Sequence, residues 1–253
     1  MKEYHSLQKV YNELLPLMGS NPEPFETVCR VEEHRHFWRP KQPRVILLAE
    51  SHVYTALQEL RGMRGFYVPG MDGVPRTYVR LVYCLGYGEN EYAGWPVGNN
   101  PGTPQFWKIF YSCLHGPDNG FSPILKTQTP VFSHRIANKY EVLRNLQRRG
   151  IWLLDASMVA LYRTGALRSD GDTVERVIRL SWQDYVSHVF SAAKPEFTIL
   201  IGKGMERAIG QQIRDMVGNR YTCLPQPQAR LSAEEHYSVL RKYYEICREY
   251  AAA

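Results

Sequence analysis

The residues best suited to chemistry follow a short apolar run near the start of the chain. Val45–Leu48 are four consecutive apolar residues, a pattern typical of a strand that is buried on both faces. Glu50, Ser51 and His52 come just after this run and bring a carboxylate, a hydroxyl and an imidazole. Open α/β folds bind their ligands at the carboxyl ends of their strands. We therefore expect these three residues to be catalytic, and a polar loop without chemistry is the alternative interpretation.

Three later apolar runs also predict strands, and each ends on polar or conformationally special residues. They begin near residues 151, 197 and 221, and they end on Asp155, on Gly202–Lys203 and on Pro225–Arg230. The segments between them are long enough for helical crossovers of a parallel sheet. The sequence therefore predicts an α/β fold, a three-layer α/β/α arrangement around a central four-stranded parallel sheet, with one site where the four strand ends meet.

The remaining pattern predicts a single domain over residues 1–253, with a helical extension over 1–40. Glycines and prolines interrupt residues 61–101, so this range is expected to be an irregular insertion with one short helix near 78–85. Helices are also predicted over 139–149, 181–193 and 205–217, and after a capping box formed by Ser232 and Glu235. His34 and His36 are expected on a solvated face of the extension.

Composition limits the classes of partner. The net charge of +6 suits a polyanion such as DNA. The five cysteines are scattered and form no C-x-x-C pair, so we expect no disulfide framework and no metal site, and no cofactor is implied. No apolar run is long enough to cross a bilayer. A cytoplasmic, monomeric protein without a membrane partner is the expectation.

Five motifs in order give the chain a specific resemblance. They are Leu48–His52, Gly102–Lys108, Gly150–Asp155, Ile199–Lys203 and Pro225–Arg230. In this order and spacing they resemble the uracil-DNA glycosylase superfamily, nearest to its mismatch-specific thymine/uracil branch. The resemblance covers about residues 43–235 and implies a monofunctional DNA N-glycosylase that flips a base out of the duplex and leaves an abasic site.

The first motif departs from the family, and the resemblance assigns its residues altered roles. The water-holding Asp or Asn of the family falls on Ser51, and the following Pro falls on His52, which we expect to contact the leaving base. Glu50 is expected to stabilise the cationic sugar or to orient the water. Val53 falls near a tyrosine that guards against substituents at the base's 5-position, and Tyr54 is expected beside the base.

The third motif ends on Asp155, where the family has an asparagine that reads the base. A carboxylate only accepts hydrogen bonds, so it would repel uracil O4 and accept from the amino group of cytosine. Burial could also raise the pKa of Asp155 so that a protonated carboxyl donates to cytosine N3. The alternative interpretation is that Asp155 caps a helix over 156–161. Leu224 replaces a histidine that some members use against the leaving base.

The last motifs are expected to hold DNA. Gln226, Arg230 and Leu231 fall where family members insert a wedge into the gap left by the flipped base, and Lys203 lies on the turn after the third strand. Arginines of the 61–101 and 163–168 loops are expected to contact phosphates.

These expectations favour a glycosylase for cytosine or for 5-modified, hypermodified cytosine, with defence against phage that carry modified DNA as a role. Three alternatives stay open at this point. One is a non-catalytic member that binds DNA or protein through the same groove, which Ser51 and Leu224 favour. Another is a uracil/thymine mismatch repair glycosylase. An unrelated α/β enzyme is the third, although the chain lacks the G-x-G-x-x-G, Walker A and G-x-S-x-G motifs.

Overall fold

The computed structural model of the chain describes residues 2–62, 71–89, 102–162, 171–226 and 228–252. Its centre is a four-stranded sheet in the order β2-β1-β3-β4, and all neighbouring strands run parallel. The strands are β1 (Val45–Ala49), β2 (Ile151–Asp155), β3 (Phe197–Ile201) and β4 (Tyr221–Leu224). The predicted α/β fold with a central four-stranded parallel sheet is confirmed.

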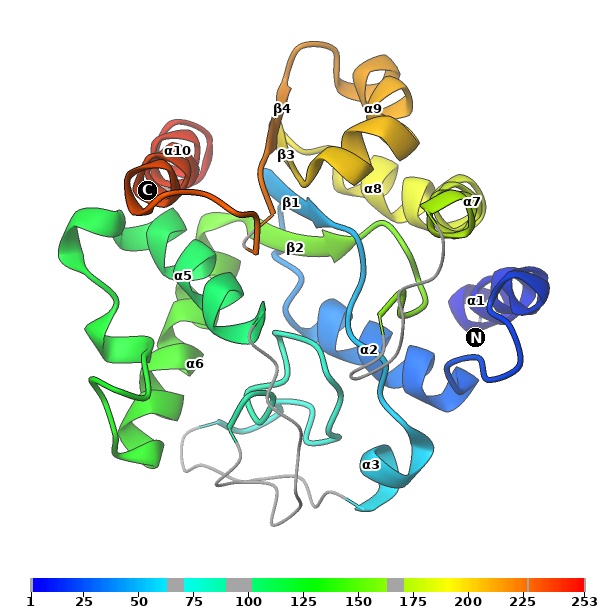
Figure 1. Cartoon of the computed structure of the whole chain (residues 1–253), viewed down its shortest axis with the longest axis horizontal. Helices are drawn as coiled ribbons and strands as arrows, with labels where there is room; N and C mark the ends of the chain where they lie inside the picture. The colour runs from blue at the N-terminus through cyan, green and yellow to red at the C-terminus, as the bar shows by residue number, and fades with distance from the viewer. Residues whose placement is uncertain (1, 63–70, 90–101, 163–170, 227, 253) are drawn as a thin grey trace.

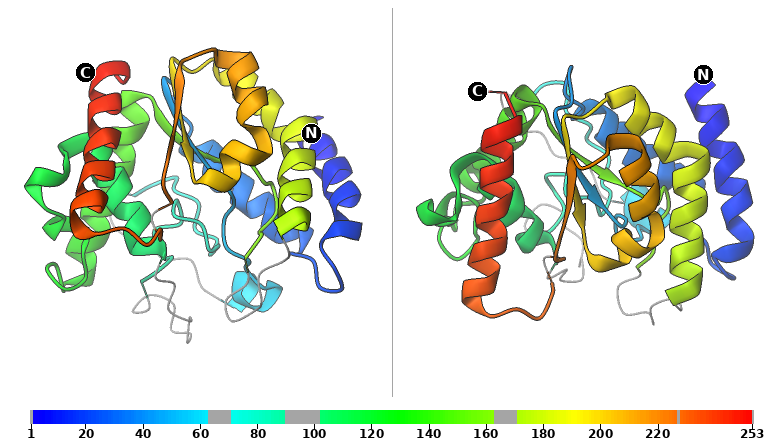
Figure 2. Two further views of the ribbon diagram at one scale, coloured as in Figure 1. Left: turned by 45° about the horizontal axis from the view of Figure 1, so that its top comes forward. Right: turned by 90° about the horizontal axis from the view of Figure 1, so that it is seen from above.

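Continuous apolar runs place the strands correctly because both faces of the sheet are covered. Every residue of β1 and β2 is buried. Figures 1 and 2 show α5, α6 and α10 on one side of the sheet and α7, α8 and α9 on the other, with α1 packed outside α7. This is the three-layer arrangement expected from the sequence.

The helices are α1 (Lys2–Leu14), η1 (Leu15–Leu17), α2 (Phe25–Phe37), α3 (Leu57–Gly62), α5 (Gly102–His115), η2 (Pro117–Asn119), η3 (Ser122–Ile124), α6 (Phe132–Arg149), α7 (Gly171–Ser181), η4 (Trp182–Val186), α8 (Ser187–Ala193), α9 (Lys203–Val217) and α10 (Ala233–Tyr250).

Several predicted helix ends are confirmed by their caps. Gly150 ends α6 in the left-handed conformation, with φ of 78°. Ser232 and Glu235 form the predicted capping box at the start of α10. Two boundaries differ from the prediction. α6 begins at Phe132, and the helix predicted over 181–193 is preceded by α7 and begins with η4, one turn of π-helix.

The prediction of a helix near 78–85 is wrong, because these residues form consecutive turns. An ion cluster fixes the end of this segment instead. The buried Glu89 carboxylate accepts from Arg135 Nη2 at 2.5 Å and from Lys139 Nζ at 2.5 Å, and both cations lie on α6. Burial favours the neutral acid, but the two cations hold the pKa of Glu89 below its ordinary value.

The N-terminal helices belong to the core. The predicted solvated face is wrong for His34, which is buried, with its Nε2 2.8 Å from the carbonyl oxygen of Thr77. His36 is exposed, as expected. Among the helices described, none is both long and apolar enough to pass through a bilayer.

Candidate active site

The ends of β1 and β2 lie side by side at the carboxyl edge of the sheet. Ala49 is paired with Asp155 in the parallel register. The ladder continues into the loops, because the backbone N–H of Ser157 donates to the carbonyl oxygen of Glu50 at 2.9 Å. The structure therefore brings together Glu50 and Asp155, the two carboxylates that the sequence singled out.

Glu50 lies between the loop that follows β2 and the first turn of α9. The residue is 6% exposed, and the phenol of Tyr162 donates a hydrogen bond to its Oε2. On the other side lies Gly204, in the first turn of α9: a Cβ atom at this position would be 2.7 Å from Glu50 Oε1. A glycine is therefore required there for the carboxylate to keep its place.

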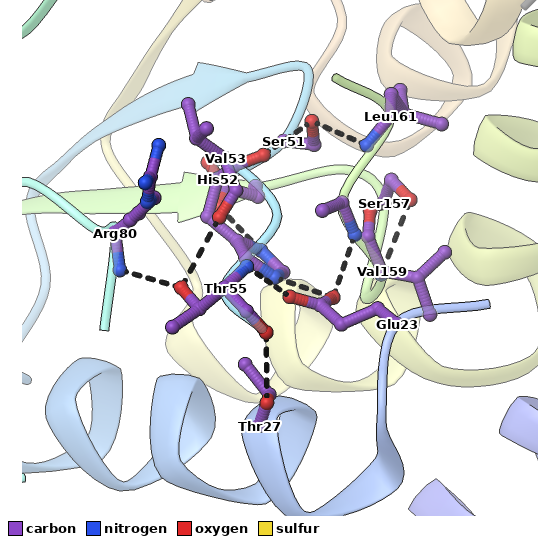
Figure 3. A network of polar contacts seen from close by, with 12 residues as sticks. Glu23, Thr27, Ser51, His52, Val53, Thr55, Arg80, Ser157, Val159 and Leu161 are labelled. Atoms are coloured by element: carbon purple, nitrogen blue, oxygen red, sulfur yellow. Dashed lines mark hydrogen bonds and ion pairs between the residues drawn. The ribbon is translucent and has the colours of Figure 1, made fainter. Parts of the chain in front are cut away.

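The hydroxyl of Ser51 is occupied by backbone contacts. Its Oγ donates to the carbonyl oxygen of His52 at 2.9 Å and accepts from the N–H of Leu161 at 3.1 Å. Figure 3 shows this side chain between the loops after β1 and β2. The only proton of the hydroxyl is used in this bond, so Ser51 joins two loops in this structure.

His52 is enclosed by charged side chains. Its Nε2 lies 2.8 Å from Glu23 Oε2, a contact drawn in Figure 3, and its Nδ1 lies 3.6 Å from Asp155 Oδ2. The side chains of His52 and Glu23 are 0% exposed. Burial favours the neutral ring, but the carboxylates of Glu23 and Asp155 outweigh it and raise the pKa of His52 to about 9. His52 is thus a buried cation, and in this structure it has no surface to offer to a base.

Asp155 is an ionised carboxylate. Arg35 of α2 donates from Nη2 to Asp155 Oδ2 at 2.5 Å. Burial alone would raise the pKa of Asp155, but Arg35 and His52 outweigh it and hold that pKa below its ordinary value. The expectation of a raised pKa and a protonated carboxyl is therefore wrong. The helix-cap alternative is also wrong, because residues 156–161 form a loop.

Val53 and Tyr54 lie in the loop after β1 and contact the loop after β2. Val53 makes an isolated parallel bridge with Tyr162, and the N–H of Tyr54 donates to the carbonyl oxygen of Tyr162 at 2.9 Å. Both side chains are half-buried. The bridge therefore joins the loop after β1 to Tyr162, the residue whose phenol donates to Glu50.

Two residues of this site, Glu23 and Arg35, were missed in the sequence. Glu23 accepts from the N–H of Ala160 at 2.9 Å in addition to its contact with His52. Prolines on both sides of Glu23 mark a rigid segment, which is the only local signal. Arg35 looks like an ordinary helix-surface arginine, and its partner Asp155 lies 120 residues away in the sequence.

The ends of β3 and β4 carry the predicted DNA-binding residues. Lys203 and Arg230 are exposed, whereas Gln226 and Leu231 are half-buried. Gly202 has a φ of 107°, and a Cβ there would be 2.6 Å from Gln226 Cγ. Gln226 and Leu231 also line a cavity of about 330 Å³ between the β4–α10 loop, α5 and α10. Gln226, Arg230 and Leu231 therefore lie on the β4–α10 loop, next to the turn after β3 that carries Lys203.

The arginines expected to contact phosphates divide into three groups. Arg80 is buried and pairs with Glu59 at 2.5 Å, so its assignment to a phosphate is wrong. Arg61 and Arg76 are exposed, and Arg61 pairs with Glu26 at 2.6 Å. The others fall outside the described residues; they are Arg64, Arg163 and Arg168.

Comparison with protein-family models, with curated proteins and with solved structures finds no match. In the part of the chain that the structure describes, no three His, Cys, Asp or Glu side chains are grouped so that they would hold a metal ion. The candidate site therefore consists of the strand ends themselves, with Glu50 and Asp155 as its central carboxylates.

Proposed function

We propose that the protein is a DNA N-glycosylase that acts on a flipped base at the carboxyl edge of the sheet. The observation that carries this proposal is Glu50, a carboxylate at the end of the central strand β1, held by Tyr162 and given room by Gly204. Hydrolysis of an N-glycosidic bond needs a negative charge beside the sugar and a positioned water. Glu50 places a carboxylate where this charge is needed, and its oxygens can accept a hydrogen bond from the water.

The reaction breaks one bond and forms one. The C1′–N bond breaks, and its electron pair leaves with the base, so that an oxocarbenium-like sugar develops beside Glu50. The oxygen of a water then bonds to C1′, and Glu50 accepts a proton from this water. The leaving base takes up one proton from solvent, and Glu50 returns the proton of the water to solvent. The products are a free base and an abasic site.

The chemistry of Asp155 favours cytosine as the base. As an ionised carboxylate Asp155 accepts hydrogen bonds only, so it is complementary to the amino group of cytosine and repels O4 of uracil. Oδ2 is engaged by Arg35, and Oδ1 takes no hydrogen bond from any residue that the structure describes. The small Val53 suits a substituent at the 5-position. Modified cytosines of phage DNA are the corresponding substrates, and defence against such phage is the corresponding role.

The direct test is the release of base from oligonucleotides that contain cytosine, 5-modified cytosine or uracil, followed by heating in alkali to convert abasic sites into strand breaks. We expect strand breaks at cytosine or its derivatives and a loss of about 100-fold or more in Glu50→Gln. Glu196→Gln is the matched control, because Glu196 lies at the opposite end of the sheet in a surface pair with Arg44. It should react like the wild type.

One observation favours a non-catalytic DNA-binding protein as a second candidate. Within the motif that follows β1, His52 is enclosed and Ser51 uses its hydroxyl proton for a backbone contact, which leaves Glu50 alone for chemistry. A wild type that binds these oligonucleotides and releases no base from any of them would support this second candidate and contradict the glycosylase.

A further inference from the structure

We propose that Arg35 is a positioning residue that fixes Asp155 as a charged hydrogen-bond acceptor and thereby sets the preference for cytosine over uracil. This inference rests on the proposed glycosylase function. It makes α2 part of the site, although the sequence gives this helix no chemistry.

The buried guanidinium of Arg35 lies against the carboxylate of Asp155. Arg35 is 3% exposed, and its Nη2 lies 2.5 Å from Asp155 Oδ2 and 3.2 Å from His52 Nδ1. Trp152 of β2 donates from Nε1 to the carbonyl oxygen of Arg35 at 3.2 Å. The backbone of α2 is therefore fixed to the same strand that carries Asp155.

A second carboxylate orients the guanidinium from behind. Glu32, one turn earlier on α2, pairs with Arg35 through Nη1, and the phenol of Tyr185 donates to Glu32 Oε2 at 3.2 Å. Tyr185 lies in η4, the π-helical turn between α7 and α8. Both terminal nitrogens of the Arg35 guanidinium are thus paired, so the side chain has little freedom to move away from Asp155.

The charges around Asp155 decide which hydrogen bonds it makes. Arg35 and the imidazolium of His52 face Asp155 directly, Glu23 faces His52, and the buried phenol of Tyr83 lies nearby. Without Arg35, one buried cation remains beside Asp155, so burial raises the pKa of Asp155 toward protonation. A protonated carboxyl can donate to O4 of uracil, and the discrimination against uracil is then lost.

The experiment compares release of uracil and of cytosine by the wild type, Arg35→Met and Arg35→Lys at several pH values between 5 and 8. We expect Arg35→Met to raise the uracil-to-cytosine ratio about tenfold or more, and to raise it further as the pH falls. Arg35→Lys keeps the positive charge and should restore most of the wild-type ratio. The wild-type ratio should not change with pH in this range, since Asp155 stays ionised.

Glu33→Gln is the matched control, because Glu33 also lies on α2 but pairs with Arg30 at the surface, at 3.0 Å, and its loss leaves the bond between Arg35 and Asp155 in place. Its ratio should stay near that of the wild type. Circular dichroism and melting curves identify any variant that does not fold. If Arg35→Met does not fold, titration of the Asp155 carboxyl by carbon-13 NMR in the wild type decides: ionisation that persists below the ordinary range supports the inference, and titration at or above that range overturns it.

The outcomes separate this inference from the proposed function. An inactive wild type overturns both. An active wild type, together with a folded Arg35→Met variant whose base ratio and pH profile are unchanged, overturns the role of Arg35 alone. A tenfold or larger change in ratio that Arg35→Lys reverses supports it.

Discussion

At the scale of single residues, the position of Glu50 depends on the absence of a side chain at Gly204. Gly204→Ala places a methyl group 2.7 Å from Glu50 Oε1, and Tyr162 limits the room for the carboxylate to move. We expect base release to fall by about 100-fold, as small displacements of a catalytic group can cause. Stability should change little, because the strain of displacing Glu50 opposes the higher helix propensity of alanine. The measurement is single-turnover base release alongside a melting curve.

Gly171→Ala is the control for this variant, since Gly171 also lies in the first turn of a helix and a Cβ there meets nothing within 4 Å. It should leave base release unchanged. A wild-type rate in Gly204→Ala would show that the reaction does not depend on where the Glu50 carboxylate lies.

The carboxylates of the site could be predicted from the sequence, but the residues that control them could not. Glu50 and Asp155 each end an apolar run, and the end of a buried strand is a local pattern. Glu23 and Arg35 have no such pattern. Arg35 becomes buried because α2 packs beside β2, and Glu23 because the segment before α2 packs against the loops after β1 and β2. Their partners His52 and Asp155 lie far along the chain. A buried ion cluster is a property of tertiary packing, and single-sequence periodicity does not report it.

At the scale of elements, the turn-rich segment 71–89 is fixed to α6 by Glu89. Glu89→Gln leaves the buried cations Arg135 and Lys139 without their counter-charge. Loss of one partner from a buried cluster costs about 3–5 kcal/mol, so we expect the free energy of unfolding to fall by this order. Urea titration of the wild type and the variant measures the difference.

Glu141→Gln is the control on α6, because Glu141 lies on the surface and pairs there with Arg148 at 3.8 Å. Its effect should stay below about 1 kcal/mol. Equal effects of the two variants would contradict a structural role for the Glu89 cluster.

The elements were predicted correctly where an apolar pattern is continuous, and wrongly where a buried charge or a series of turns interrupts it. The four strands were placed correctly because each is a short, continuous apolar run between two helical layers. The start of α6 was missed because a buried arginine, Arg135, interrupts its apolar face. The expected helix at 78–85 is absent because its aromatic residues form a buried layer of turns; for example, the phenol of Tyr83 accepts from the N–H of Leu153 at 2.7 Å.

At the scale of the whole molecule, the free energy of unfolding should depend on pH through His52. His52 connects the N-terminal segment, the loop after β1 and the end of β2, through Glu23 and Asp155. Its pKa is raised from 6.5 to about 9 in the folded protein. A raised pKa gives stability that is complete below the unfolded value near 6.5 and is lost as the pH rises through about 9. The total is about 3 kcal/mol.

Urea unfolding at pH 6 and at pH 8 tests this dependence, because the contribution of His52 should fall by about 2 kcal/mol between them. His34 and His115, whose pKa values are lowered by burial, act in the opposite direction and reduce the net loss. Buried thiols and phenols such as Cys84 and Tyr83 act in the same direction as His52, since burial raises their pKa values, but they contribute only near and above their ordinary range.

His52→Gln removes the titrating group, so the difference in slope between the two proteins isolates His52. Because Asp155 and Arg35 stay charged throughout this interval, a wild type whose stability changes with pH in the same way as that of His52→Gln would mean that His52 is neutral in the folded protein. The pairs of Arg35 with Asp155 and Glu32 would then be the ion pairs that remain in this cluster.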